Sequence, residues 1–172
     1  MRDFSSALAQ ITNQENIEYS KGGLQVTAVR TVVFERLPRV LILHMKRFVY
    51  TAGETRKVRK HIPLDHRFSI PKSALSSSAK IQLHSLDVVS ADKNVESAGY
   101  RAQAVVYHHG KHAAGGHYTV DVRQGKSGHW VHIDDTVITP IGEEEVVGKR
   151  QSEREGDPYL IFYHLITEDR QS

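Results

Sequence analysis

Apolar and polar residues alternate with a period of two through much of the chain, which is typical of half-buried β-strands. Helical spacing is limited to residues 3–11, where Asp3 can cap a short helix, and to a single predicted turn at residues 143–147. We therefore predict an α+β chain dominated by antiparallel strands. The expected strands are residues 24–35, 40–50, 55–62, 100–108, 118–123, 130–133 and 159–165.

Glycines and one apolar run refine this pattern. Gly22-Gly23 predicts a turn before the first strand, and Gly53 predicts a hairpin turn after residues 40–50. The continuous apolar run at residues 40–43 suggests a strand that is buried on both faces.

Two segments do not fit the strand pattern. Residues 64–71, bounded by prolines, are expected to be irregular. Residues 73–97 are rich in serine and polar residues, and we expect them to form a surface insertion. The remaining residues of the 172-residue chain are then one domain, or a large piece of one.

Composition is ordinary for a soluble globular protein, with 39% hydrophobic and 25% charged residues. No apolar run approaches the roughly 20 residues that span a bilayer, so we expect no membrane partner. Residues 1–11 lack the apolar core of a signal peptide. We expect a cytoplasmic location, with the nucleus as an alternative.

The net charge is +3, and the densest basic cluster is residues 56–61. No aromatic residue interleaves with this cluster, so a solvated strand edge is favoured over a nucleic-acid surface. We therefore expect no nucleic-acid partner. The chain has no cysteine, which excludes disulfides, thiolate zinc sites and a cysteine nucleophile within these residues.

One constellation carries candidate chemistry. Gly115 and Gly116 precede His117, which stands where one predicted strand begins, and Asp134-Asp135 follows the next strand. In an antiparallel hairpin the start of one strand lies beside the end of its partner. His117 and Asp134 are therefore expected to meet at one end of the sheet.

A histidine beside a carboxylate fits a general base whose tautomer is fixed by an orienting acid. The two glycines would let a substrate backbone approach closely. Taken singly, the same residues also fit a surface histidine, a glycine turn and an aspartate turn. The arrangement alone leaves the catalytic and the purely structural interpretation about equally favoured.

Four sequence blocks stand out along the chain. They are LPRVLILHMKRF at residues 37–48, YRAQAVVYH at residues 100–108, GGHY at residues 115–118 and WVHIDD at residues 130–135. In their order and spacing these blocks resemble the ubiquitin-specific protease family of papain-like cysteine hydrolases, and residues 159–163 resemble its last core strand. The ends of two blocks are most similar to the branch that contains ubiquitin-specific protease ten.

The resemblance implies a papain-like cysteine protease fold with a strand-rich palm, partial fingers and a missing helical thumb. Residues 1–172 would be the C-terminal portion of one catalytic domain. It further implies that His117 is the general base, Asp134 the orienting acid and Asp135 a supporting polar residue. Gly115, Gly116 and Tyr118 would line the channel for the Gly-Gly tail of ubiquitin.

The implied activity is deubiquitination, the thiol-dependent hydrolysis of the (iso)peptide bond after the last glycine of ubiquitin. The partners would be ubiquitin and ubiquitinated proteins. Because the cysteine is missing, the chain is expected to be inactive alone. The alternative is a non-catalytic ubiquitin-binding or scaffold protein with the same fold.

No cofactor or metal is expected. The family's zinc-binding cysteines are missing around residues 19–23. Four histidines, at positions 108, 109, 112 and 117, could suggest a metal site. That interpretation is disfavoured because His117 has a better role and the other three are expected on a loop.

Overall fold

The computed structural model describes residues 4–51, 53–60, 62–85, 97–112, 115–125, 127–147 and 156–167. The chain divides into two compact units. The first unit contains residues 1–37, 68–99 and 166–172, and the second unit contains residues 38–67 and 100–165. The second unit carries all the candidate site residues, so the units are described separately.

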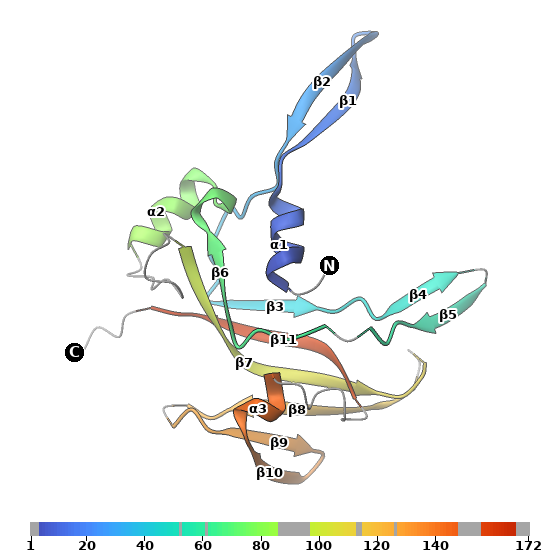
Figure 1. Ribbon diagram of the computed structural model, residues 1–172, viewed down its shortest axis with the longest axis vertical. Helices are drawn as coiled ribbons and strands as arrows, with labels where there is room; N and C mark the ends of the chain where they lie inside the picture. Colours follow the sequence, from blue (N-terminus) through green and yellow to red (C-terminus); the bar gives the residue numbers. More distant parts are fainter. Residues whose placement is uncertain are drawn as a thin grey trace. The chain divides into compact units, whose positions relative to one another are not determined.

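The second unit is built on an antiparallel sheet with the strand order β10-β9-β8-β7-β11-β3 (Figure 1). Each neighbouring pair in this order is antiparallel, which confirms the predicted fold class. The strands are β3 (Val40–His44), β7 (Ser97–His109), β8 (His117–Arg123), β9 (Trp130–Asp134), β10 (Val137–Ile141) and β11 (Asp157–Leu165).

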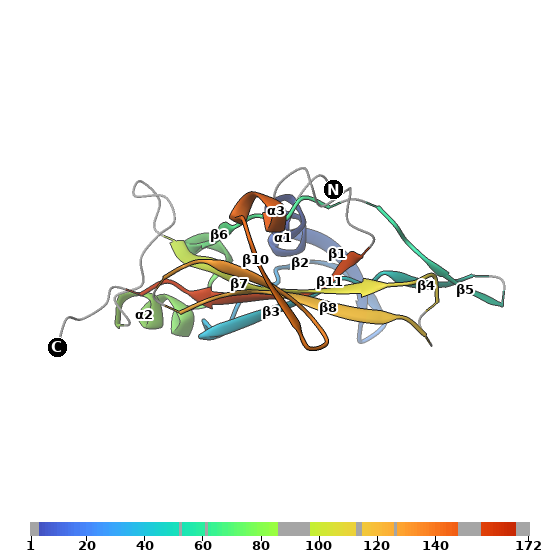
Figure 2. The ribbon, with the colours of Figure 1, turned by 90° about the horizontal axis from the view of Figure 1, so that it is seen from below.

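Alternate residues of the two central strands form the core of this sheet. On β7, Val105 and Tyr107 are buried, and on β11, Ile161 and Tyr163 are buried. Burying a large apolar side chain contributes roughly 1.5–3 kcal/mol relative to leaving it exposed. The helix α3 (Glu143–Val147), which confirms the predicted helical turn, lies on one face of the sheet (Figure 2).

The strand β10 was missed by the sequence analysis. It follows β9 through a two-residue turn in which Asp134 pairs with Val137. Asp135 has a φ of 50°, a left-handed conformation that aspartate tolerates better than most residues. Because β10 is an edge strand, it can also accommodate Pro140.

The predicted strand at residues 40–50 is divided into two. β3 ends at His44, and β4 (Phe48–Thr51) forms a separate hairpin with β5 (Glu54–Lys57). The predicted turn at Gly53 is confirmed, with a φ of 86°. Residues 45–47 separate the two strands, and the buried guanidinium of Arg47 donates to the carbonyl of Pro158 at 3.1 Å.

The expected burial of β3 on both faces was wrong. Val40 and Ile42 are 50% and 52% exposed, whereas Leu41 and Leu43 are more enclosed. The alternating exposure along β3 shows that only one of its faces lies on the core. The apolar run therefore belongs to a strand with one exposed face, on which Val40 and Ile42 lie, and not to a strand that is covered on both faces.

The first unit contains α1 (Phe4–Thr12), which confirms the predicted helix, although Asp3 lies outside the described residues. The hairpin β1 (Glu15–Lys21) and β2 (Leu24–Arg30) turns at Gly22-Gly23 as predicted. Only the second of these strands was expected. β1 was missed because the segment preceding Gly22 is almost entirely polar.

The segments expected to be irregular are more ordered than their composition indicates. β6 (Arg67–Pro71) pairs with β7 and buries Phe68 and Ile70. After the short helix η1 (Lys72–Ala74), α2 (Ser77–Ser85) buries Ala79 and Leu83. The expectation that residues 64–71 are irregular was therefore wrong for β6. Residues 86–96 lie outside the described residues, and an insertion over 73–97 stays a prediction.

Candidate active site

His117 is the first residue of β8 and pairs in register with His109, at the end of β7. Residues 110–116 connect these two strand ends and are called the histidine loop, of which the structure describes residues 110–112, 115 and 116. Asp134 is the last residue of β9, the strand on the other side of β8. Three neighbouring strands thus bring His109, His117 and Asp134 to one end of the sheet.

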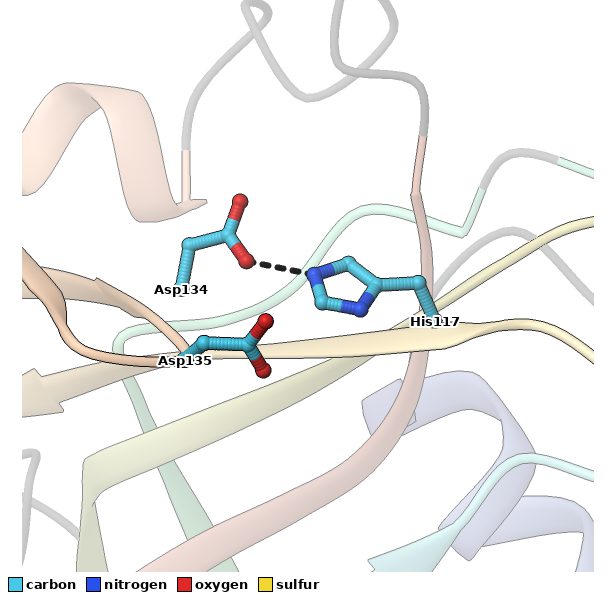
Figure 3. Close-up of side chains that lie close together, drawn as sticks. All are labelled: His117, Asp134 and Asp135. Atoms are coloured by element: carbon cyan, nitrogen blue, oxygen red, sulfur yellow. Dashed lines mark hydrogen bonds and ion pairs between the residues drawn. The ribbon is translucent and has the colours of Figure 1, made fainter.

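Nε2 of His117 is hydrogen bonded to Oδ1 of Asp134, which confirms the predicted meeting of these residues (Figure 3). The two side chains are 45% and 48% exposed, so the pair is open to solvent. Asp135 comes from the same turn as Asp134, and both carboxylates point toward the imidazole (Figure 3). The three residues predicted to carry the chemistry therefore lie together.

This arrangement defines the protonation of His117. A carboxylate only accepts hydrogen bonds, so Nε2 of His117 carries the hydrogen and Nδ1 is left as the basic atom. The hydrogen bond to Asp134 raises the pKa of His117 above its ordinary value, and the charges of Asp134 and Asp135 raise it further. The site therefore stabilises an imidazolium.

A second histidine beside His117 behaves in the opposite way. The rings of His109 and His117 are 5.7 Å apart, and Nε2 of His109 lies 2.9 Å from Oγ1 of Thr119. Burial lowers the pKa of His109, and the nearby charge of His117 lowers it further. His109 is thus the neutral neighbour of a readily protonated His117.

The two glycines of the histidine loop have different surroundings. A Cβ placed on Gly116 would lie 2.3 Å from the carbonyl oxygen of His109 and 2.5 Å from Nε2 of His108. A Cβ on Gly115 would meet no atom of the described residues within 4 Å. Gly116 is therefore required by close packing under the loop, whereas Gly115 presents a bare, exposed backbone.

Tyr118 follows His117 and is 50% exposed. Its ring lies 5.0 Å from that of His108 and 6.1 Å from that of Tyr159, measured between centroids. Tyr118 thus packs against an aromatic cluster while about half of its surface stays exposed. Gly115, Gly116 and Tyr118 flank His117 in sequence, and their role as a channel stays a prediction.

The described residues contain one group of three potential metal ligands, and it is His117, Asp134 and Asp135, whose ligand atoms lie within 4.8 Å of one another. Within this group Nε2 of His117 is hydrogen bonded to Asp134, and the expectation that no metal binds here stays a prediction. The expectation that His108 and His109 lie on a loop was wrong, because both belong to β7.

Sequence reasoning missed Lys57 and its partners. The basic cluster at residues 56–61 was interpreted as a solvated edge, which fits Arg56 but was wrong for Lys57, whose side chain is only 3% exposed. Its ammonium forms an ion pair with Asp157 at 2.8 Å. The two residues are so far apart in sequence that no local pattern could have joined them.

Among the helices of the described residues, none combines the length and the apolar character that a membrane crossing needs.

The sequence model of the family described as "ubiquitin carboxyl-terminal hydrolase" matches residues 3–163. The probable ubiquitin carboxyl-terminal hydrolase 3 of Schizosaccharomyces pombe is 41% identical over 157 residues, which are 84% of this chain and 27% of that protein. Ubiquitin carboxyl-terminal hydrolase 10 of Mus musculus is 35% identical over 170 residues, or 96% of this chain and 20% of that protein.

The similarity to hydrolase 10 agrees with the branch expected from the sequence blocks. The chain spans about a quarter or less of the length of these relatives. Among solved structures, the fold matches a chain of the SAGA Ubp8/Sgf11/Sus1/Sgf73 DUB module bound to ubiquitin aldehyde. The TM-score is 0.68 at 22% identity, covering 95% of this chain and 33% of that chain. The protein belongs to the ubiquitin carboxyl-terminal hydrolase family.

Proposed function

We propose that this chain supplies the general base and the tail-binding surface for cleavage of the (iso)peptide bond after the last glycine of ubiquitin. The observation that carries the proposal is the His117–Asp134 pair at the end of β8, in a chain of this family. The substrates would be ubiquitin attached to proteins, and ubiquitin itself would be the binding partner.

In the proposed reaction, Nδ1 of His117 removes the proton from a cysteine thiol as the thiolate attacks the carbonyl carbon. Asp134 holds the imidazole by Nε2 and stabilises the imidazolium that results. The same imidazolium then protonates the leaving amine, which releases the substrate lysine. Water finally hydrolyses the thioester, with His117 again acting as the base.

The tail-binding surface is formed by Gly115, Gly116 and Tyr118. The exposed backbone of Gly115 lets an extended, side-chain-free peptide approach closely. Tyr118, half exposed and supported by Tyr159, provides a wall beside it. Such a channel would select the Gly-Gly tail by shape, because a larger side chain would not fit against this wall.

The nucleophile must come from outside these 172 residues, because they contain no cysteine. The chain alone is therefore proposed to bind ubiquitin without cleaving it. Nothing in the proposed reaction requires a cofactor from this chain, since the base and its orienting acid are both side chains.

Calorimetric titration of the purified chain with ubiquitin tests the proposal. A matched ligand is ubiquitin without its last two glycines, which keeps the folded body and removes the tail. We expect binding of complete ubiquitin and at least about tenfold weaker binding of the truncated form, a difference of about 1.4 kcal/mol. Absence of binding, or equal binding of both ligands, would contradict the proposed tail channel.

A second candidate is a non-catalytic ubiquitin-binding or scaffold protein, which the absence of cysteine favours. An electrophile on the C-terminus of ubiquitin separates the two. The chain alone should not be labelled in either case. If the chain never promotes labelling of a cysteine-bearing polypeptide to which it binds, the scaffold function is favoured.

A cytoplasmic location, with the nucleus as the alternative, stays a prediction. Fluorescence microscopy of the tagged protein in its own cells tests it directly.

A further inference from the structure

The ammonium of Lys57, at the end of β5, is held in an enclosed site. Its Nζ atom lies 2.8 Å from Oδ2 of Asp157 and 2.8 Å from the carbonyl oxygen of His108. It also lies 3.0 Å from the carbonyl oxygen of Gly110 and 3.1 Å from Nδ1 of His108. A buried ammonium is costly unless it is paired and hydrogen bonded, and these contacts supply both.

These contacts converge on the loop that carries His117. Gly110 is the first residue of that loop, and Gly116 is the last residue before His117. A Cβ built on Gly110 would lie 3.3 Å from Cα of Gly116, so the two ends of the loop touch. Holding the carbonyl of Gly110 therefore also restricts the position of Gly116.

His108 supports the other end of the same loop. An ammonium has no lone pair, so Nδ1 of His108 must accept from Lys57 and the ring hydrogen sits on Nε2. Burial lowers the pKa of His108, and the charge of Lys57 lowers it further, which keeps the ring neutral. Nε2 lies 2.5 Å from a Cβ built on Gly116, so this ring forms the floor beneath Gly116.

Aromatic packing keeps His108 in place. Its ring lies 5.4 Å from that of Phe48 and 5.0 Å from that of Tyr118, both edge to face. Phe48 belongs to β4, so the β4–β5 hairpin contacts His108 through both Phe48 and Lys57. The hairpin is thus connected to β7 by the packed ring of His108, to β11 by the ion pair of Lys57 with Asp157, and to the histidine loop by the hydrogen bond of Lys57 to Gly110.

We propose that Lys57 is a positioning residue: through Asp157, His108 and Gly110 it fixes the loop that sets His117 against Asp134. Among the described residues no hydrogen bond or ion pair joins Lys57 to His117, so the proposed effect passes through the loop. The importance of this effect for catalysis rests on the proposed function of His117. The effect of Lys57 on the position of His117 does not depend on that proposed function.

The test uses the 172-residue chain with Lys57→Met, which keeps most of the volume and removes the charge. Arg56→Met is the matched control, because Arg56 is the preceding residue of β5 and is exposed. The readouts are the NMR titration of the His117 imidazole and the amide signals of Gly115 and Gly116. Fluorescence of Trp130, the single tryptophan and 1% exposed, reports whether each variant is folded.

Asp134→Asn is expected to lower the titration midpoint of His117. We expect folded Lys57→Met to lower this midpoint by about half of that amount or more. The amide signals of Gly115 and Gly116 should shift or broaden in the same variant. Arg56→Met should leave both readouts unchanged. If Lys57→Met folds and the His117 and glycine signals do not move, the positioning role is wrong.

Lys57→Met could fail to fold, because it leaves Asp157 without its partner. Asp157→Asn then provides the second variant, since it keeps the ammonium and both carbonyl contacts but removes the charge that holds Lys57 in place. We expect a smaller displacement of the His117 midpoint in the same direction. An unchanged midpoint in folded Asp157→Asn would contradict the proposal.

The outcomes also separate this proposal from the proposed function. If Asp134→Asn has the same His117 titration midpoint as the unmodified chain, the hydrogen bond between His117 and Asp134 is wrong. The proposed function then fails with it. If Asp134→Asn lowers the midpoint but Lys57→Met does not, only the positioning role is wrong.

Discussion

Nε2 of His117 and Oδ1 of Asp134 are joined at the end of the β8–β9 pair, although 17 positions separate the residues in sequence. The strand register produces this meeting, because Val120 is opposite Ile133 and the chain continues toward the site on both strands. The strand register of the sheet therefore brings the two residues together.

The first prediction concerns this pair. Replacing Asp134 with asparagine removes both the strong hydrogen-bond acceptor and the charge, so the raised pKa of His117 should fall toward its ordinary value. NMR titration of the imidazole measures the change. Glu144→Gln, which removes an exposed carboxylate on α3, is the control and should leave the midpoint unchanged.

The raised pKa of His117 also makes the stability of the folded chain depend on pH. Because the folded chain has the higher pKa at His117, the pair stabilises folding below the unfolded value of about 6.5. This contribution is lost as the pH rises through the raised pKa. The half-exposed position of both side chains makes it small. A His117 midpoint that is the same with Asp134 and with asparagine would contradict the first prediction.

The second prediction compares the two loop glycines. Gly116→Ala would place a methyl group 2.3 Å from the carbonyl oxygen of His109, so it should destabilise the chain by about 1–3 kcal/mol. Gly115→Ala meets no atom within 4 Å in the part of the chain that the structure describes, and it should change stability by no more than about 0.5 kcal/mol. Urea unfolding followed by tryptophan fluorescence measures both, and equal effects would show that the loop packing is wrong.

The third prediction concerns a buried hydroxyl in the sheet. Tyr163 on β11 donates to the carbonyl oxygen of Asp65 at 2.8 Å, and its side chain is almost fully buried. Tyr163→Phe leaves that carbonyl without this donor and should lower the free energy of unfolding by about 1 kcal/mol. Tyr50→Phe, at a residue that is 76% exposed, is the control and should have almost no effect. A loss no larger than the control's would contradict the hydrogen bond.

Local patterns in the sequence were sufficient for much of the fold and for the central pair. Alternation predicted β7, β8, β9 and β11, and the hairpin rule then placed His117 beside Asp134. The chemistry of that pair did not follow from the pattern. The same spacing also fits a turn, and the resemblance to a family decided between the two.

Other features depend on contacts between distant segments, which alternation does not record. Alternation does not predict β10, because the turn at Asp135 and the proline at position 140 are both typical of strand ends. An edge strand tolerates both. β3 resembles a central strand although Ile42 is half exposed. Lys57 is indistinguishable in sequence from its exposed basic neighbours, since its burial is set by Asp157 on β11.

The most direct test of the proposed function is to observe His117 while ubiquitin binds. The imidazole signals of His117 are recorded as the 172-residue chain is titrated with ubiquitin, and again with ubiquitin that lacks its last two glycines. We predict that the His117 signals shift with complete ubiquitin and do not shift with the truncated form, because only the tail reaches the histidine loop. His117 signals that respond equally to both ligands, or to neither, would contradict the proposed function.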